Sequence, residues 1–217
     1  MTGISLFDIT RAALREQICI LLGQDGPERP ANGRLYRMLR ALDNARLAEG
    51  HCGEPLICNL TELLDGLCAA LATLLAARGH DLYTALPKAQ LYARLNPDAI
   101  TAAACNLIVN AFEHSGAQRV RLRLTSSSGN AVITVSDKGQ GIAAASLLGL
   151  GLPAVKRICE AFGGNLKTAT GGGTSVTITL PLCERPDPIS RYRAPECIDY
   201  LLDRFSRAYV AVRAMDE

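Results

Sequence analysis

The chain has 217 residues, which is enough for one large domain or for one domain with a small appendage. Hydrophobic residues make up 48% of it and charged residues 20%, a composition typical of a globular protein and not of a disordered one. The 23 basic and 21 acidic residues leave a formal net charge of +2, so charge gives no reason to expect a nucleic-acid partner. The longest apolar run, residues 67–77, is shorter than the roughly 18 to 20 residues that span a membrane, and no secretory signal is visible.

The chain contains eight cysteines, at positions 19, 52, 58, 68, 105, 159, 183 and 197. None forms a CxxC pair, and several lie in apolar helical patterns, where a thiol behaves as a small hydrophobic side chain. A chain that can build its own core has little need of a disulfide framework. We therefore expect mostly reduced thiols and a cytoplasmic location. His51-Cys52, with Cys58 nearby, lacks the second ligand pair that a structural zinc site needs.

Periodicity divides the chain into three predicted parts. Residues 1–52 are predicted to form a helical hairpin, because apolar residues recur every three to four positions on both sides of the turn-rich segment 23–30. Residues 53–183 are predicted to form a mixed α/β domain. Residues 184–217 are predicted to form a tail with one amphipathic helix, which carries Ile198, Leu201, Leu202, Phe205 and Tyr209.

The α/β region alternates strand and helix signals. Strands are predicted at 56–58, 81–86, 90–95, 120–124, 131–135, 165–170 and 174–180, and helices at about 60–79, 98–115 and 153–162. Asn59 begins a segment with capping-box character, and Asn96-Pro97-Asp98 opens the next helix. Residues 126–130 are predicted to form a hairpin loop.

Two asparagines stand out in the helix over 98–115. Asn106 and Asn110 are four residues apart, so their side chains share one helix face. Unpaired amides are costly to bury. The pair is therefore either a capped or solvated helix edge, or a polar stripe that holds magnesium and phosphates through oxygen ligands.

Three glycine-containing segments follow. Asp137-Lys138-Gly139-Gln140-Gly141 comes directly after a strand, where a carboxylate can accept a hydrogen bond from an exocyclic amine such as that of adenine, although a plain hairpin turn is the more frequent explanation of this pattern alone. Gly149-Leu150-Gly151 opens a helix whose free N-terminal amides attract phosphate. Gly171-Gly172-Gly173-Thr174 precedes the last strand.

Taken in order, these segments resemble the ATP-binding domain of sensor histidine kinases, which DNA gyrase, the Hsp90 chaperones, MutL and the anti-sigma-factor serine kinases share. Residues 100–115 resemble the N box, 137–142 the G1 box, 149–164 the G2 box and 171–182 the closing strand. The resemblance covers roughly residues 55–182. It implies an α+β fold, a two-layer α/β sandwich with a mixed sheet under three helices, here preceded by the α-helical hairpin, and it implies ATP and magnesium as ligands.

The resemblance also assigns roles to single residues. It makes Asn110 a magnesium ligand and Asp137 the reader of adenine. It places Gly139, Gly141, Gly149 and Gly151 where the backbone approaches the nucleotide, and Thr174 near the adenine end. Asn106 stands where ATP-hydrolysing relatives carry a glutamate base; an amide cannot accept a proton near neutral pH, which favours phosphate transfer or simple nucleotide binding over hydrolysis.

The chain departs from the family pattern at several places. Glu113 stands where many of the kinases have a lysine, and the lid between Ile142 and Gly149 is reduced to residues 143–148, with Leu147 in place of a glycine. We therefore expect nucleotide to be weakly held or easily exchanged. The sequence pattern assigns no catalytic residue.

The predicted hairpin resembles the family's dimerisation and phosphoacceptor helices. Leu14-Arg15 resembles the end of the H box, which puts Ala12 at the position of the acceptor histidine. This implies a histidine kinase-like signalling protein that cannot phosphorylate itself in the usual way. A two-helix hairpin buries little surface alone, so we expect a homodimer through a four-helix bundle, although a hairpin used only for packing is the alternative.

Two other functions fit the same residues. One is a non-catalytic interaction or phosphotransfer scaffold that docks a response regulator or a sigma factor, which the missing histidine and short lid favour. The other is an anti-sigma-type serine kinase, which ranks lower because those relatives carry glutamate at the position of Asn106.

Overall fold

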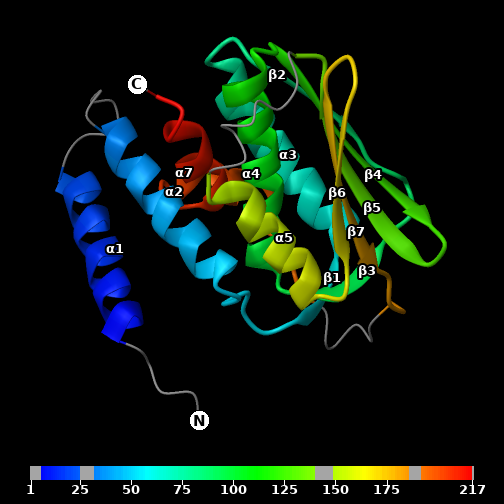
Figure 1. The fold of residues 1–217 in the computed structure, drawn as a ribbon, viewed down its shortest axis with the longest axis horizontal. Helices are drawn as coiled ribbons and strands as arrows, with labels where there is room; N and C mark the ends of the chain where they lie inside the picture. Colours follow the sequence, from blue (N-terminus) through cyan, green and yellow to red (C-terminus); the bar gives the residue numbers. More distant parts are fainter. Residues whose placement is uncertain (1–5, 25–31, 140–148, 186–191, 217) are drawn as a thin grey trace.

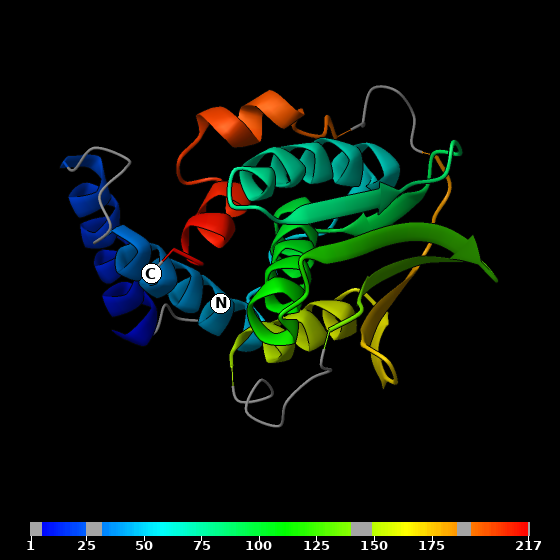
Figure 2. The same ribbon diagram turned by 90° about the horizontal axis from the view of Figure 1, so that it is seen from above.

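The computed structural model describes residues 6–24, 32–139, 149–185 and 192–216. A sheet and a layer of helices form the body of the molecule, and a pair of helices lies beside the helical layer, away from the sheet (Figures 1 and 2). This is the expected α+β sandwich preceded by a helical hairpin. In the part of the chain that is described, no helix is long and apolar enough to cross a membrane.

The main sheet has five strands in the order β2 (Asp81–Ala85), β4 (Arg119–Ser127), β5 (Asn130–Asp137), β7 (Thr174–Pro181) and β6 (Asn165–Thr170). Strands β2 and β4 run parallel, and the other neighbours are antiparallel. A separate two-stranded sheet pairs β1 (Leu56–Asn59) with β3 (Tyr92–Leu95). Strand β5 alternates buried and half-buried residues along its length, so its inner face packs on the helices.

Helices α3 (Leu60–Ala76), α4 (Pro97–Ser115) and α5 (Gly151–Ala161) cover one face of this sheet (Figure 1). The side chain of Asn59 accepts hydrogen bonds from the first turn of α3, and that of Asn96 does so for α4, which begins with a proline. Gly116, at φ 63°, ends α4 in the left-handed conformation. The helix starts predicted at Asn59 and Asn96 are therefore confirmed. One hydrophobic core lies between the sheet and the helices.

The hairpin consists of α1 (Leu6–Gln24) and α2 (Asn32–Ala48), with α2 between α1 and the body (Figure 1). Helix α2 packs on α5 and on α7 (Arg207–Arg213). A second, smaller core forms there from Ile18, Leu22, Tyr36, Leu39, Val210 and Ala214. Apolar side chains of the hairpin are thus buried against apolar side chains from the end of the chain.

The tail differs from the prediction, because it contains two short helices, α6 (Cys197–Leu202) and α7, in place of one. The carboxylate of Asp203 accepts a hydrogen bond from the backbone of Phe205 at 2.8 Å, and Ser206 caps α7 through the backbone of Tyr209 at 3.2 Å. These local bonds compete with helix continuation. The expected apolar stripe is also wrong in part, since Ile198 and Leu202 are 51% and 78% exposed.

One arginine joins the hairpin, the tail and the body. Arg207 of α7 donates a hydrogen bond to Asp43 of α2 at 2.5 Å. Two of its nitrogens also donate to the carboxylate of Asp98 of α4, at 2.6 and 2.9 Å. Asp43 also accepts a bond from Arg15 of α1 at 3.2 Å. The Asp43 side chain is only 13% exposed, and these hydrogen bonds offset the cost of removing its carboxylate from water.

We predict that Arg207→Met lowers the free energy of unfolding by about 1.5 to 3 kcal/mol, because charge-assisted bonds to Asp43 and Asp98 are lost. The measurement is urea denaturation followed by circular dichroism. The control is Arg193→Met, whose side chain is 85% exposed and pairs with Glu196, three residues later in the chain; surface pairs contribute about 0 to 1 kcal/mol. Equal losses for the two variants would contradict the structural role of Arg207.

Candidate functional site

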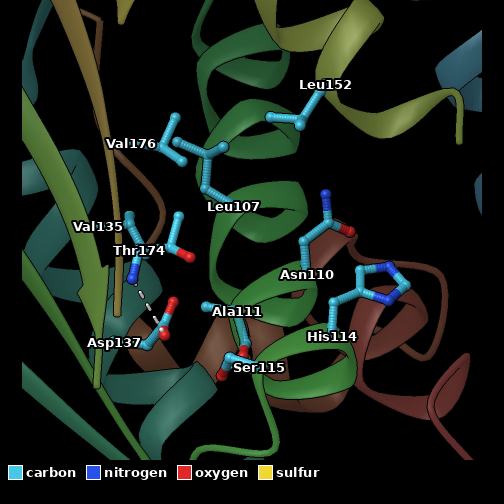
Figure 3. A pocket seen from close by; sticks show the side chains of 10 residues that line it. All are labelled: Leu107, Asn110, Ala111, His114, Ser115, Val135, Asp137, Leu152, Thr174 and Val176. Atoms are coloured by element: carbon cyan, nitrogen blue, oxygen red, sulfur yellow. Dashed lines mark hydrogen bonds between the residues drawn. The ribbon is translucent and has the colours of Figure 1, made fainter. Parts of the chain in front are cut away.

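A small cavity of about 40 Å³ lies between the sheet and the helical layer, where β5 ends and β7 begins, and it is partly open to solvent. Its described lining comes from three places (Figure 3): the strands contribute Val135, Asp137, Thr174 and Val176, helix α4 contributes Leu107, Asn110, Ala111, His114 and Ser115, and α5 contributes Leu152. Five of these ten residues are apolar, and Asp137 is their one carboxylate. The cavity therefore offers flat apolar walls with an acceptor at one end.

The carboxylate of Asp137 is held in place by backbone amides. Asp137 and Thr174 are partners across the β5–β7 pairing. Oδ1 of Asp137 accepts a hydrogen bond from the amide of Gly139 at 2.9 Å and from that of Thr174 at 3.4 Å. The residue is 9% exposed, and its other oxygen points into the space between Thr174 and Ala111 (Figure 3). One oxygen thus anchors the turn while the second is left to meet a ligand.

Two glycines allow the chain to close around this carboxylate. A Cβ on Gly139 would lie 2.1 Å from the carbonyl oxygen of Ser115, the last residue of α4. A Cβ on Gly173 would lie 2.1 Å from the carbonyl oxygen of Asp137, and Gly173 has φ 132°, which side chains rarely permit. The turn after β5 therefore sits directly against α4 on one side and the start of β7 on the other.

The two asparagines of α4 share a helix face, as predicted, but they have different neighbours. Asn110 lines the cavity, and its Oδ1 accepts a bond from Nη2 of Arg40 at 2.9 Å. Asn106 is 2% exposed and exchanges two amide bonds with Asn44 of α2, at 2.7 and 3.1 Å. The structure thus brings Asn110, Asp137 and Thr174 to one cavity, whereas Asn106 faces the hairpin.

The glycines predicted to approach the nucleotide differ in what surrounds them. Gly151 begins α5, and a Cβ there would lie 3.1 Å from Nδ2 of Asn110, so the start of α5 lies against this asparagine. Among the described residues, none lies within 4 Å of a Cβ placed on Gly149. Leu150, at the cap position of α5, supplies no side-chain bond to the first turn in the part of the structure that is described. Gly141 and the lid residues 143–148 lie outside the described residues.

Sequence reasoning missed the contribution of the hairpin to this region. Arg40 and Asn44 of α2 contact the asparagines of α4, and Arg40 also bonds Glu113 at 3.2 Å. A signal was available, because Arg40 and Asn44 are four residues apart, the spacing of Asn106 and Asn110. The neighbouring Cys105 is not a nucleophile at neutral pH, since burial raises the pKa of its thiol to about 12.

Comparison with known proteins agrees with this geometry. Residues 95–184 match the family described as histidine kinase-, DNA gyrase B- and HSP90-like ATPase. The matched segment contains α4, β4, β5, α5, β6 and β7, and so it contains all the described lining of the cavity. This part of the chain is an ATPase domain of that family, of the kind found in sensor histidine kinases.

The chain is similar to two curated sensor histidine kinases. It is 36% identical over 111 residues to ZraS of Escherichia coli, a match that covers 43% of this chain and 24% of that protein. It is 31% identical over 153 residues to RppB of Synechocystis, which covers 60% of this chain and 34% of that protein. The chain thus spans about a quarter to a third of these relatives.

Among solved structures, the histidine kinase AdeS of Acinetobacter baumannii superposes with a TM-score of 0.58 at 20% identity, over 84% of this chain and 100% of that one. At this identity the match establishes the fold alone, and it extends over the helical hairpin as well as the ATPase domain.

We predict that Gly139→Ala lowers the free energy of unfolding by about 1 to 3 kcal/mol, because the new methyl group overlaps a backbone oxygen at the end of α4. The control is Gly171→Ala, where a Cβ would meet no atom of the described residues within 4 Å. Thermal unfolding of the two variants beside the parent chain measures the effect. Unchanged stability of Gly139→Ala would mean that the turn does not lie against Ser115.

Proposed function

We propose that the cavity binds the adenine of ATP. The observation that carries the proposal is the Asp137 carboxylate, which has one oxygen fixed by the backbone and one directed into the cavity. A carboxylate accepts a hydrogen bond from the exocyclic amine of adenine, whereas the carbonyl of guanine at the same place would be repelled. Leu107, Leu152 and Val176 offer apolar surface to the base.

The phosphates of the nucleotide lie toward Asn110 and the start of α5 in this proposal. The first turn of a helix presents free amides and a partial positive charge, which attract phosphate. Gly149 and Gly151 let the nucleotide approach this backbone, with Gly141 assigned the same role, and Thr174 stands beside the adenine end. With only residues 143–148 to form a lid, the nucleotide exchanges easily.

A magnesium ion bound with the nucleotide would take the amide oxygen of Asn110 as a ligand, since Mg²⁺ prefers oxygen donors. In the described arrangement this oxygen already accepts a bond from the guanidinium of Arg40, so a metal ion on its second lone pair would lie close to a positive charge. We therefore assign no step to the metal.

The protein is proposed to act as a histidine kinase-like signalling protein without self-phosphorylation at the usual position. Residues 1–52 serve as a dimerisation-like hairpin without an acceptor histidine, 53–183 as the ATP-binding domain and 184–217 as the tail. Ala12 lies exposed on α1 and has no group that can accept a phosphoryl group. Asn106 is an amide bonded to Asn44 and Arg40, so it cannot act as a base for water.

The exposed Ala12 also favours a second function for the same fold. Here the ATP-binding domain phosphorylates no residue of its own chain and instead docks a response regulator or another signalling protein, with nucleotide setting its conformation. The two functions differ in whether labelled phosphate from ATP reaches the partner protein.

Self-association through the hairpin is part of the proposal. Helix α1 leaves Ile9, Leu14, Ile20 and Leu21 between 42% and 56% exposed. Leu14 and Leu21 are seven residues apart, two helical turns, so they form a stripe on one face of α1. Pairing two hairpins into a four-helix bundle covers this apolar surface, whereas a single copy leaves it in water.

We predict that Asp137→Asn weakens ATP binding by about 10- to 100-fold, the effect of losing a charge-assisted hydrogen bond. Titration with a fluorescent ATP analogue, competed by ATP and by GTP, measures it. Asp81→Asn is the control, because Asp81 is 53% exposed and pairs with Arg119. If the parent chain binds no adenine nucleotide at millimolar nucleotide concentration, the proposed function is wrong.

We predict that replacing Leu14 and Leu21 together by glutamate converts a dimer into a monomer, because two charges per copy would be buried in the bundle. Sedimentation equilibrium gives the mass directly. The control replaces Ile198 and Leu202 of α6 by glutamate, since these are also exposed apolar residues but lie outside the hairpin. If the parent chain is already monomeric, association through α1 is ruled out.

A further inference from the structure

Helix α2 places a cation on the asparagine face of α4. The guanidinium of Arg40 donates to three oxygens in succession along that helix: Asn106 Oδ1 at 3.3 Å, Asn110 Oδ1 at 2.9 Å and Glu113 Oε2 at 3.2 Å. Amide and carboxylate oxygens of this kind are the donors that a hard divalent cation selects. An arginine that spans all three therefore stands in the place of a metal ion.

The position of Arg40 is built into the packing and is not that of a mobile surface side chain. Its side chain is 15% exposed. One turn further along α2, Asn44 and Asn106 exchange two hydrogen bonds, and both residues are buried, at 7% and 2% exposure. Such amides must be paired when they are removed from water. This pair therefore fixes the register of α2 on α4 and delivers Arg40 to Asn110.

A guanidinium and a magnesium ion cannot both use this site without cost. Arginine stays protonated at all relevant pH values, and two cations that share one amide oxygen repel each other strongly in a partly buried site. Magnesium also requires close octahedral geometry and gives up its water reluctantly, so it gains little from an oxygen that is already bonded. Arg40 in turn brings a positive charge next to the place proposed for the phosphates.

We propose that Arg40 replaces magnesium at Asn110, so that the site takes metal-free nucleotide and admits magnesium only when Arg40 withdraws. This inference rests on the proposed function, because it presumes that adenine nucleotide enters the cavity beside Asn110. It makes the cationic side chain of α2 the determinant of which form of the nucleotide, free or metal-bound, is held.

The experiment compares ATP binding in EDTA and in magnesium for the full chain and for Arg40→Met. The parent chain is expected to bind ATP in EDTA, with an affinity that magnesium changes by less than about threefold. Arg40→Met is expected to bind about tenfold more weakly in EDTA, a difference of about 1.4 kcal/mol, and to recover affinity in magnesium. Arg46→Met is the matched control, because Arg46 is an exposed arginine on the same helix.

A direct metal readout accompanies the nucleotide titration. Mn²⁺ binding in the presence of ATP, followed by electron paramagnetic resonance, is expected to be stronger in Arg40→Met than in the parent chain. Arg40→Gln, which keeps a hydrogen-bond donor but loses the charge, is expected to behave as Arg40→Met does and serves if that variant does not fold.

The outcomes separate the two ideas. Equal magnesium dependence of the parent chain and both Arg40 variants would overturn the inference while leaving nucleotide binding intact. Absence of binding in every chain, with and without metal, would instead remove the proposed function itself.

Discussion

The structure depends on one requirement, that buried amides be hydrogen-bonded. Asn106 lies at the centre of α4 among buried apolar residues, and the amide of Asn44 meets it from a different part of the chain. Because neither residue is satisfied alone, the hairpin has one favourable position on the body. That position in turn sets which side chain of α2 reaches the cavity, namely Arg40, one turn away.

The cavity itself is made by backbone geometry more than by special side chains. The pairing of Asp137 with Thr174 across two strands puts the carboxylate at the sheet end, and the amides of the turn hold it there. Gly139 then lets the turn lie against α4 and Gly173 lets β7 begin beside it. Recognition of a ligand by such a cavity needs only one charged group, provided that the orientation of this group is fixed before the ligand binds.

Much of the body could be predicted from the sequence, because its signals are local. Strand alternation, the caps Asn59 and Asn96 and the glycine turns all depend on residues close in the chain. The partners of Asn106 could not be predicted in this way, since Asn44 is 62 residues distant and only packing brings it near. The prediction of a single helix in the tail was wrong for a different reason. Asp203 and Ser206 make local hydrogen bonds that interrupt the helix, although the apolar pattern favours one continuous helix.

Helix α2 has one side against α1 and the other against α5 and α7. A rigid helix in that position cannot shift on one side alone, so events at its two sides are thermodynamically linked. A molecule that favours one arrangement of the hairpin changes nucleotide affinity only to the extent that nucleotide binds the arrangements with different affinities, and nucleotide then changes the affinity for that molecule by the same factor. The sandwiched helix therefore allows reciprocal communication without any long chain of intermediate residues.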